Sequence, residues 1–167
     1  MNQAGITVHN RPVVDAALSR AEETEAPAAA LELADGRMIT GKTTDLLGPC
    51  AALLLNALKE LAGIPHSQPV ISPAAIEPIQ TLKTQYLGSK NPRLHMDEVL
   101  IALSVSAASD PNAQKALEQL PNLKGCQAHT SVMVSDVDRK LFMKLSIQAT
   151  FEAKYENNSV IFPKKGI

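Results

Sequence analysis

The sequence AAALELADGRMITGK, residues 28–42, decides the fold. It contains two runs typical of β-strands, residues 28–33 and 37–42, on either side of a short polar segment. Asp35-Gly36 within that segment favours a β-hairpin, because glycine tolerates the positive φ that the turn requires. The apolar side chains of the predicted hairpin are Leu31, Leu33, Met38 and Ile39.

Helices dominate the sequence that follows the hairpin. Residues 47–62 predict a helix that is apolar on nearly every side, which is typical of a helix buried against a sheet. Right-handed crossovers make the last three predicted strands mutually parallel if they are adjacent. The predicted fold class is α/β, with three α/β/α layers around a mixed sheet. Further helices are expected at 72–87 (bent or delayed by Pro78), 96–109, 110–120 and 136–145, and strands at 70–71, 127–134 and 147–155.

The two ends of the chain differ from the central α/β domain, which we assign to residues 28–156. Residues 1–27 predict an N-terminal helical arm, with its helix at 11–26 ended by Pro27. The apolar side of this helix is too small for stability in isolation, so we expect the arm to pack on another surface. Residues 157–167 predict a disordered tail.

Composition and charge limit the partners that the chain can bind. Lys and Arg number 16 and Asp and Glu 17, so there is no excess positive charge to attract nucleic acid or an anionic membrane. No apolar run is long enough for a signal peptide or a transmembrane helix, and Cys50 and Cys126 suggest no disulfide framework. We therefore expect a cytoplasmic protein that binds neither nucleic acid nor membrane.

Three long segments of the chain, residues 31–64, 71–107 and 120–135, carry a family resemblance. Within them GSKNPRLHMDEVLIALS, residues 88–104, and LKGCQAH, residues 123–129, are long and unusual strings. The segments resemble the carboxyl-terminal part of a bacterial family catalogued as domain of unknown function 1846. The resemblance extends from Arg11 to Tyr155, and NNSVIFPKKGI at the end of the chain departs from it.

The resemblance implies a setting in a longer protein and a fold, but no reaction. Members of the family are longer, and their amino-terminal part carries a glycine-rich segment that looks phosphate-binding. This chain has no G-x-x-x-x-G-K pattern, so we expect a fragment whose partner is the missing amino-terminal part. The resemblance also implies a cytidine-deaminase-like three-layer topology, with which the predicted strand order is compatible.

Zinc-dependent deamination is not expected from these residues. A deaminase of that fold needs H-x-E at the helix after the hairpin and P-C-x-x-C at the start of the next helix. Here the corresponding segments are Leu46-Leu47-Gly48-Pro49-Cys50 and Ser72-Pro73-Ala74-Ala75, which offer no such ligand set. We predict no metal and no cofactor.

One candidate ligand-binding loop follows the hairpin. Lys42 and Thr43, with Thr44 and Asp45 after them, lie where the second strand delivers the chain to a helix. Backbone N–H groups, hydroxyls and a lysine at such a point can hold an anion. The alternative is that Thr44 or Asp45 only caps the helix.

The second candidate loop, residues 88–95, joins two predicted helices. Its lysine and arginine can bind a phosphate or a carboxylate, the arginine in a bidentate manner. The alternative is a solvated connecting loop whose cations contact helix C-termini or Glu98. His95 and Glu98 could also form a metal-binding pair, but an acid that only stabilises the first turn of the helix is favoured. The candidate residues are Ser89, Lys90, Asn91, Arg93 and His95.

Cys126 and His129 are weaker candidates, as a nucleophile and its base. Their separation of three residues places them on opposite faces of a regular strand, unless a bulge intervenes. A small buried cysteine and a hydrogen-bonded histidine are the favoured interpretation. Asn56, in an otherwise apolar helix, is interpreted as a core amide with its hydrogen bonds satisfied.

The leading hypothesis is a domain of a larger cytoplasmic protein that is not an enzyme on its own. Its two polar loops would help to bind an anionic, phosphate-bearing small molecule, completed by the missing part. A structural module for oligomerisation, including a homo-oligomer, or for inter-domain packing is the alternative. A stand-alone enzyme that uses Cys126 and His129 is the third hypothesis.

Overall fold

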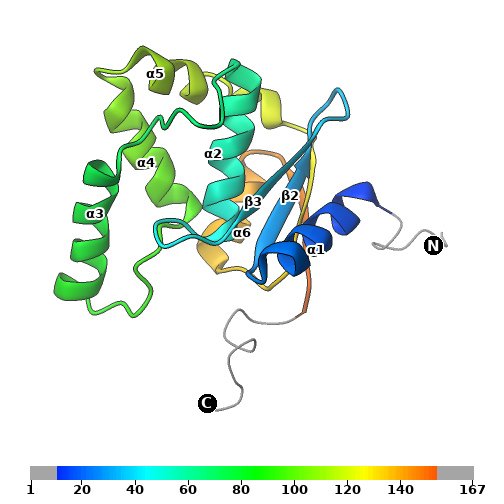
Figure 1. Ribbon diagram of the computed structural model, residues 1–167, viewed down its shortest axis with the longest axis horizontal. Helices are drawn as coiled ribbons and strands as arrows, with labels where there is room; N and C mark the ends of the chain where they lie inside the picture. The colour runs from blue at the N-terminus through cyan, green and yellow to red at the C-terminus, as the bar shows by residue number, and fades with distance from the viewer. Residues whose placement is uncertain (1–10, 154–167) are drawn as a thin grey trace.

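The computed structural model describes residues 11–153, and the described chain is a mixed α/β structure (Figure 1). The predicted tail at 157–167 lies outside the described residues. In chain order the elements are α1 (Pro12–Thr24), β2 (Ala28–Glu32), β3 (Met38–Lys42), α2 (Pro49–Ala62), α3 (Pro73–Thr81), η2 (Leu82–Tyr86), α4 (Met96–Ala107), α5 (Pro111–Leu117), η3 (Leu120–Leu123), β4 (Gln127–Thr130), α6 (Asp136–Lys144) and β5 (Gln148–Phe151).

The four strands form one mixed sheet in the order β3-β2-β4-β5. The predicted hairpin is confirmed, because β2 and β3 pair in antiparallel fashion with Ala28 opposite Lys42 and Glu32 opposite Met38. Gly36 in its turn has a φ of 92°, a conformation that side chains with a Cβ rarely adopt. β2 also pairs with β4 in antiparallel fashion, and β4 pairs with β5 in parallel fashion, so the mixed sheet is confirmed as well.

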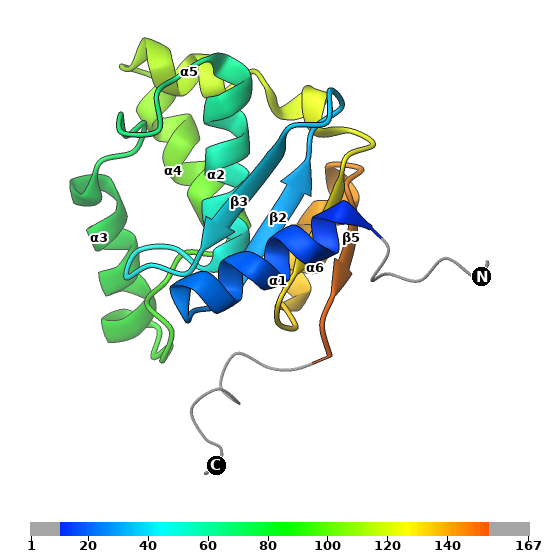
Figure 2. The ribbon, with the colours of Figure 1, turned by 45° about the vertical axis from the view of Figure 1, so that its right-hand side comes forward.

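Helices cover both faces of this sheet (Figure 2). The alternation of side chains along β2 separates the two packing layers: Ala30 packs with Val13, Val14 and Ala17 of α1, whereas Leu31 belongs to the larger core on the side of α2. The predicted N-terminal arm therefore packs on the sheet of its own chain.

A single arginine fixes the start of this arm to the far strands of the sheet. Arg11 Nε donates to Gln127 Oε1 at 2.8 Å, and Arg11 Nη1 donates to Thr150 Oγ1 at 2.9 Å. A third bond joins Arg11 Nη2 to the Ala128 carbonyl at 3.3 Å. Contacts that reach both β4 and β5 account for the position of α1 across the sheet.

Three predicted strands differ in the structure, the last only in its bounds, since the strand predicted at 147–155 is β5 at Gln148–Phe151. Val70 and Ile71 are not a strand but two buried residues in an irregular segment before α3, so only β4 and β5 of the three strands expected to be parallel form a parallel pair. The strand predicted at 127–134 ends at Thr130, because the chain leaves the sheet there. After β4, Ser131 still donates its N–H to the Ala28 carbonyl of β2, and Val132 is buried outside the ladder of paired residues.

Two predicted helices also differ in detail. The helix predicted at 72–87 begins at Pro73, tolerates Pro78 and continues through η2 as a π-helical turn. The helix predicted at 96–109 ends at Ala107, and Ile101 and Val105 are 62% and 70% exposed, so only one side of α4 faces the core. No helix within residues 11–153 has the length and apolar character needed to cross a bilayer.

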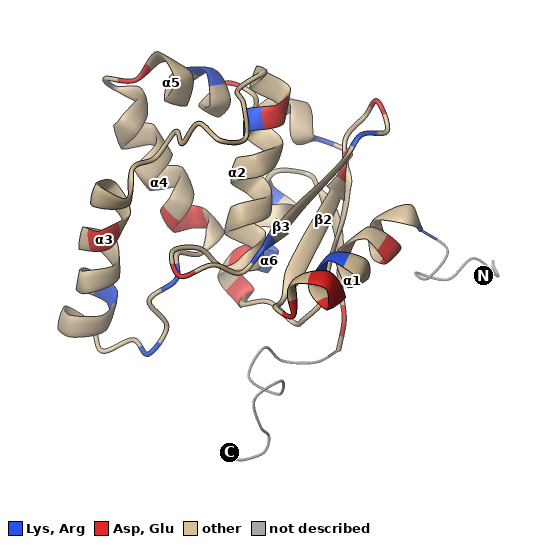
Figure 3. Ribbon diagram, viewed as in Figure 1, with Lys and Arg blue, Asp and Glu red and all other residues tan. Residues whose placement is uncertain are grey.

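Acidic and basic residues are interspersed over the helices and loops of the described chain (Figure 3). This distribution agrees with the formal net charge of −1 for the whole sequence. Any site for a charged ligand must therefore depend on a few residues brought together locally, and not on a field from one face of the molecule.

Candidate functional site

The two candidate loops of the sequence lie side by side in the fold. The backbone N–H of Leu94 donates to the Leu46 carbonyl at 3.0 Å, and that of Gly48 donates to the Leu94 carbonyl at 3.2 Å. Arg93 adds a side-chain bond, because its Nε donates to the Thr44 carbonyl at 2.6 Å. The loop before α2 and the loop before α4 are thus joined by both backbone and side-chain bonds.

A small pocket of about 60 Å³ lies beside this junction. It collects residues from the N-terminal ends of α2, α4 and α6, where backbone N–H groups without a helical partner carry partial positive charge. Such an arrangement favours negative charge, part of which the Asp138 carboxylate already supplies at the pocket. The lining residues are Gly48, Pro49, Cys50, Asn91, Arg93, Leu94, His95, Val132, Met133, Val134, Ser135 and Asp138.

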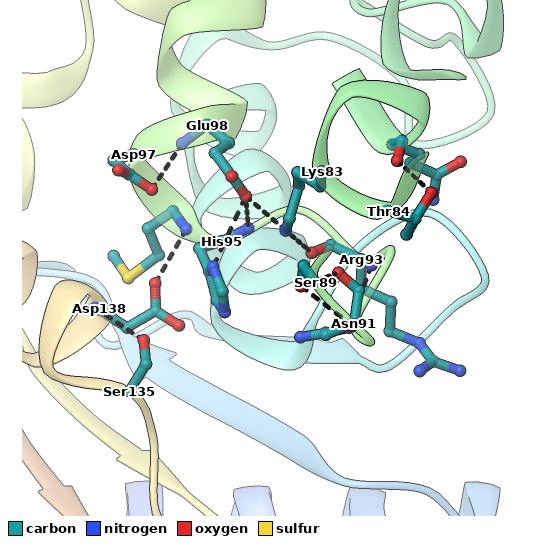
Figure 4. A network of polar contacts seen from close by, with 12 residues as sticks. Lys83, Thr84, Ser89, Asn91, Arg93, His95, Asp97, Glu98, Ser135 and Asp138 are labelled. Atoms are coloured by element: carbon teal, nitrogen blue, oxygen red, sulfur yellow. Dashed lines mark hydrogen bonds and ion pairs between the residues drawn. The ribbon is translucent and has the colours of Figure 1, made fainter. Parts of the chain in front are cut away.

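The loop at 88–95 is shaped by its own short-range hydrogen bonds (Figure 4). Ser89 Oγ accepts from the backbone N–H of Asn91 at 3.1 Å, and Asn91 Oδ1 accepts from the backbone N–H of Arg93 at 3.1 Å. The guanidinium of Arg93 extends away from these bonds, and Lys90 is exposed. Ser89 and Asn91 therefore hold the loop, whereas the two cations remain at its surface.

An ion pair between Lys83 and Glu98 supports the loop at 88–95. Lys83 Nζ donates to the Arg93 carbonyl at 2.5 Å and to Glu98 Oε1 at 2.9 Å. The same Glu98 oxygen accepts from the backbone N–H of His95 at 2.8 Å, so the acid also caps the start of α4. Lys83 was missed by sequence reasoning, because nothing local distinguishes it from a solvated lysine of an amphipathic helix.

Lys42 and Thr43 do not line the small pocket beside the loop at 88–95. Thr43 is held to the segment between α1 and β2, since both its N–H and its hydroxyl donate to the Pro27 carbonyl, at 2.9 and 3.0 Å. Thr44 Oγ1 accepts from the N–H groups of Leu46 and Leu47 and so shapes the loop before α2. The capping alternative is wrong, because the N-cap of α2 is Gly48 and no side chain caps this helix. Lys42 is exposed and lines a separate hollow beside β3.

Asp138 is the functional candidate that sequence reasoning missed. Its carboxylate is buried at the pocket, and Oδ1 accepts from the backbone N–H of Met96 at 2.9 Å. Burial raises the pKa of this carboxyl, while the bond from Met96 lowers it. The pattern Ser135-x-x-Asp138 does signal a helix start, and Ser135 Oγ accepts from the Asp138 N–H at 3.2 Å, but the pattern does not reveal that the acid reaches α4.

Cys126 and His129 belong to different environments. Cys126 packs in the core on the α2 side, where burial raises the pKa of its thiol and so disfavours the nucleophilic thiolate. His129 is buried with Nδ1 at 2.6 Å from Thr150 Oγ1 and Nε2 at 2.8 Å from Glu152 Oε2. Across residues 11–153, no group of three or more His, Cys, Asp or Glu side chains has the geometry of a metal site.

Comparison with known proteins places this domain in a family. Residues 9–161 match the family described as "Domain of unknown function DUF1846, C-terminal". The chain belongs to this family. The chain is also similar to proteins named UPF0371 protein. Relatives from Corynebacterium efficiens and Corynebacterium glutamicum are 57% and 56% identical to it over 160 residues. A UPF0371 protein from Streptococcus thermophilus is 48% identical over 156 residues.

This DUF1846 C-terminal chain is matched almost completely, but its relatives are much longer. The alignments cover 96% of the chain and 32% of each Corynebacterium relative, and 93% of the chain and 32% of the Streptococcus relative. The chain thus spans about a third of the length of the curated relatives that it matches. It corresponds to one domain of a larger protein.

The buried carboxyl of this DUF1846 domain gives a pH prediction. Because the pKa of Asp138 is raised in the folded state, the folded protein binds more protons than the unfolded chain from about pH 4 up to that raised pKa. The free energy of unfolding contributed by Asp138 therefore falls as pH rises through this window. Asp138→Asn removes the titrating carboxyl and keeps an oxygen acceptor for the Met96 N–H. The free energy of unfolding of this variant, relative to that of the parent chain, should therefore increase with pH.

Urea unfolding of both chains at intervals from pH 4 to 7.5 measures this difference. Asp136→Asn, which removes an exposed charge from the same helical turn, is the control for the interaction with the helix dipole. A stability difference between Asp138→Asn and the parent that stays constant with pH contradicts the prediction.

Proposed function

We propose that this domain supplies one wall of a binding site for an anionic, phosphate-bearing small molecule in a larger cytoplasmic protein. The observation that carries the proposal is the junction of the two loops, in which the Arg93 side chain is anchored to the Thr44 carbonyl at the rim of the pocket. A guanidinium with one fixed nitrogen loses less conformational entropy on binding an anion than a free one.

The chemistry of the surrounding residues supports an anion more than a neutral ligand. Arg93 offers terminal N–H groups suited to two phosphate or carboxylate oxygens, and exposed Lys90 adds a second positive charge. The N-terminal ends of α2, α4 and α6 add partial positive charge at the same pocket. Burial raises the pKa of Asp138, so its carboxylate is neutralised beside an anion more readily than an exposed one.

The domain alone does not form a complete site in this proposal. The pocket of about 60 Å³ is smaller than the several hundred Å³ typical of sites for small molecules. The longer relatives have about two thirds of their chain elsewhere, since only 32% of their length is matched. The rest of the protein would therefore enclose the ligand, and any reaction would need residues from both parts.

We also infer that the sheet has cytidine-deaminase-like topology, an inference that rests on the family resemblance and does not carry the function. The order β3-β2-β4-β5, with β2 antiparallel to its neighbours and a parallel pair after it, supports this topology. The zinc chemistry of that fold is not proposed here, because the corresponding helix starts at Pro49 and Pro73 lack its ligand pattern.

The double variant Lys90→Ala/Arg93→Ala tests the ligand proposal. It is made in a chimaera in which this chain replaces the matching third of the Corynebacterium glutamicum relative. Removal of two charged donors is expected to weaken binding of ATP or inorganic phosphate by at least about tenfold, measured by isothermal titration calorimetry. Lys115→Ala, which removes a lysine of α5 away from the pocket, is the control and should bind as the parent does.

A chimaera that binds these probes equally well with and without the double substitution rules out the assignment. That result favours the second candidate function, a module for inter-domain packing without a ligand. The observation in favour of this alternative is the exposure of large apolar side chains on η2 and α4, among them Tyr86, Leu87 and Val105.

A further inference from the structure

β3 forms an open edge of the sheet, and the direction of its backbone groups can be derived. In an antiparallel pair, alternate residues direct their N–H and C=O groups toward the partner strand and away from it. Thr43 donates its N–H to the Pro27 carbonyl, so the backbone of Thr43 faces β2. The N–H and C=O groups of the preceding residue, Lys42, and of Thr40 and Met38 are therefore directed away from β2. In agreement, the Thr40 carbonyl accepts from Asn56 Nδ2 of α2 at 2.9 Å.

A hollow of about 390 Å³ lies along this edge. Its lining includes the whole of β3, with Arg20 of α1 on one side and Leu55, Asn56 and His66 on the other. Arg20 lies at the edge of the hollow and pairs with Glu23 through Nη1, while its buried Nε has no hydrogen-bond partner within residues 11–153.

We propose that β3 is a docking edge for an extended strand supplied by the amino-terminal two thirds of the longer protein. The match to about 32% of the length of the Corynebacterium relatives leaves the larger part of those chains as a permanently attached partner. Strand addition joins the outward N–H and C=O groups of β3 to a new neighbour and covers an edge that would otherwise invite aggregation. Arg20 and Lys42 line the hollow, and the one acid in its lining, Glu60, is paired with Arg37. The added strand therefore carries a carboxylate on the side that faces Arg20 and Lys42.

A second copy of this chain fits the edge less well. A twofold pairing of β3 with β3 would place the same surface of each copy against the other. Two hollows would then face each other, and neither would be filled. An added strand with side chains on the side of the hollow can fill it, so the covalently linked segment is the better occupant.

Amide hydrogen exchange in the 167-residue chain and in the chimaera described above tests this inference. The amides of Met38, Thr40 and Lys42 should exchange at least about tenfold more slowly in the chimaera, whereas those of Ile39 and Gly41, which face β2, should be protected in both. Thr40→Pro removes the central outward donor at an edge position that tolerates proline, and should abolish the added protection at Met38 and Lys42. Thr40→Val keeps the N–H group and is the matched control.

If the amides of Met38, Thr40 and Lys42 exchange at the same rate in the 167-residue chain and in the chimaera, the proposal is overturned. Protection that depends on protein concentration in the 167-residue chain would overturn it in favour of self-association. If Thr40→Pro prevents folding, the comparison of the two unsubstituted proteins still decides. Because the readout is strand protection and not ligand affinity, its failure is distinct from failure of the anion site.

Discussion

Gly41→Ala is expected to destabilise the domain by about 3 kcal/mol or more. Gly41 lies in the middle of β3, where α2 crosses the sheet at very close range. A Cβ at this position would lie 2.6 Å from Leu53 Cα and 2.8 Å from the carbonyl carbon of Ala52, both of them backbone atoms of α2. Backbone cannot rotate aside as a side chain can, so the helix or the strand must move.

Urea unfolding followed by circular dichroism measures this effect. Gly48→Ala is the matched control, because its Cβ would have 3.7 Å of space to the Leu94 carbonyl and its φ is −70°. The control is expected to cost less than about 1 kcal/mol, as for an ordinary change at a helix N-cap. Similar losses for the two variants would contradict the explanation by close backbone approach.

The hairpin could be predicted from the sequence because its determinants are local. Asp35 and Gly36 specify the turn, and Asp35 Oδ1 accepts from the backbone N–H of Arg37 at 3.0 Å. The strand predicted at 70–71 was wrong because its evidence was hydrophobicity alone. Val70 and Ile71 are indeed buried, but a strand also needs a neighbour to pair with, and that depends on the rest of the fold.

The candidate site was predictable only in part for the same reason. The polar loop at 88–95 stands out in the sequence, and so does the acid in the first turn of the helix after it. The bond from the His95 N–H to Glu98 was not predicted. The contact of this loop with Thr44 joins residues that lie 49 positions apart, and the bond from Met96 to Asp138 spans 42 positions. Such contacts follow from the packing of α2, α4 and α6, which local patterns do not specify.

Glu98→Ala is expected to destabilise the domain by about 2–3 kcal/mol. The Lys83 side chain is only 9% exposed, and its ammonium has the Glu98 carboxylate as its one charged partner among the described residues. Removal of the acid leaves this cation buried beside a carbonyl, and it also leaves the His95 N–H without its acceptor. The loop at 88–95 should loosen, since the Lys83 bond to the Arg93 carbonyl supports it.

Lys83→Met is expected to cost clearly less than Glu98→Ala, and this asymmetry is the sharper test. Removing the lysine removes the charge that is costly to bury, and methionine fills much of its volume. The remaining Glu98 side chain is 24% exposed, so water can solvate it while it continues to accept from His95. Urea unfolding of both variants and of the double variant gives the coupling energy between the two side chains. If Lys83→Met is as destabilising as Glu98→Ala, an uncompensated buried charge does not explain the cost of removing Glu98.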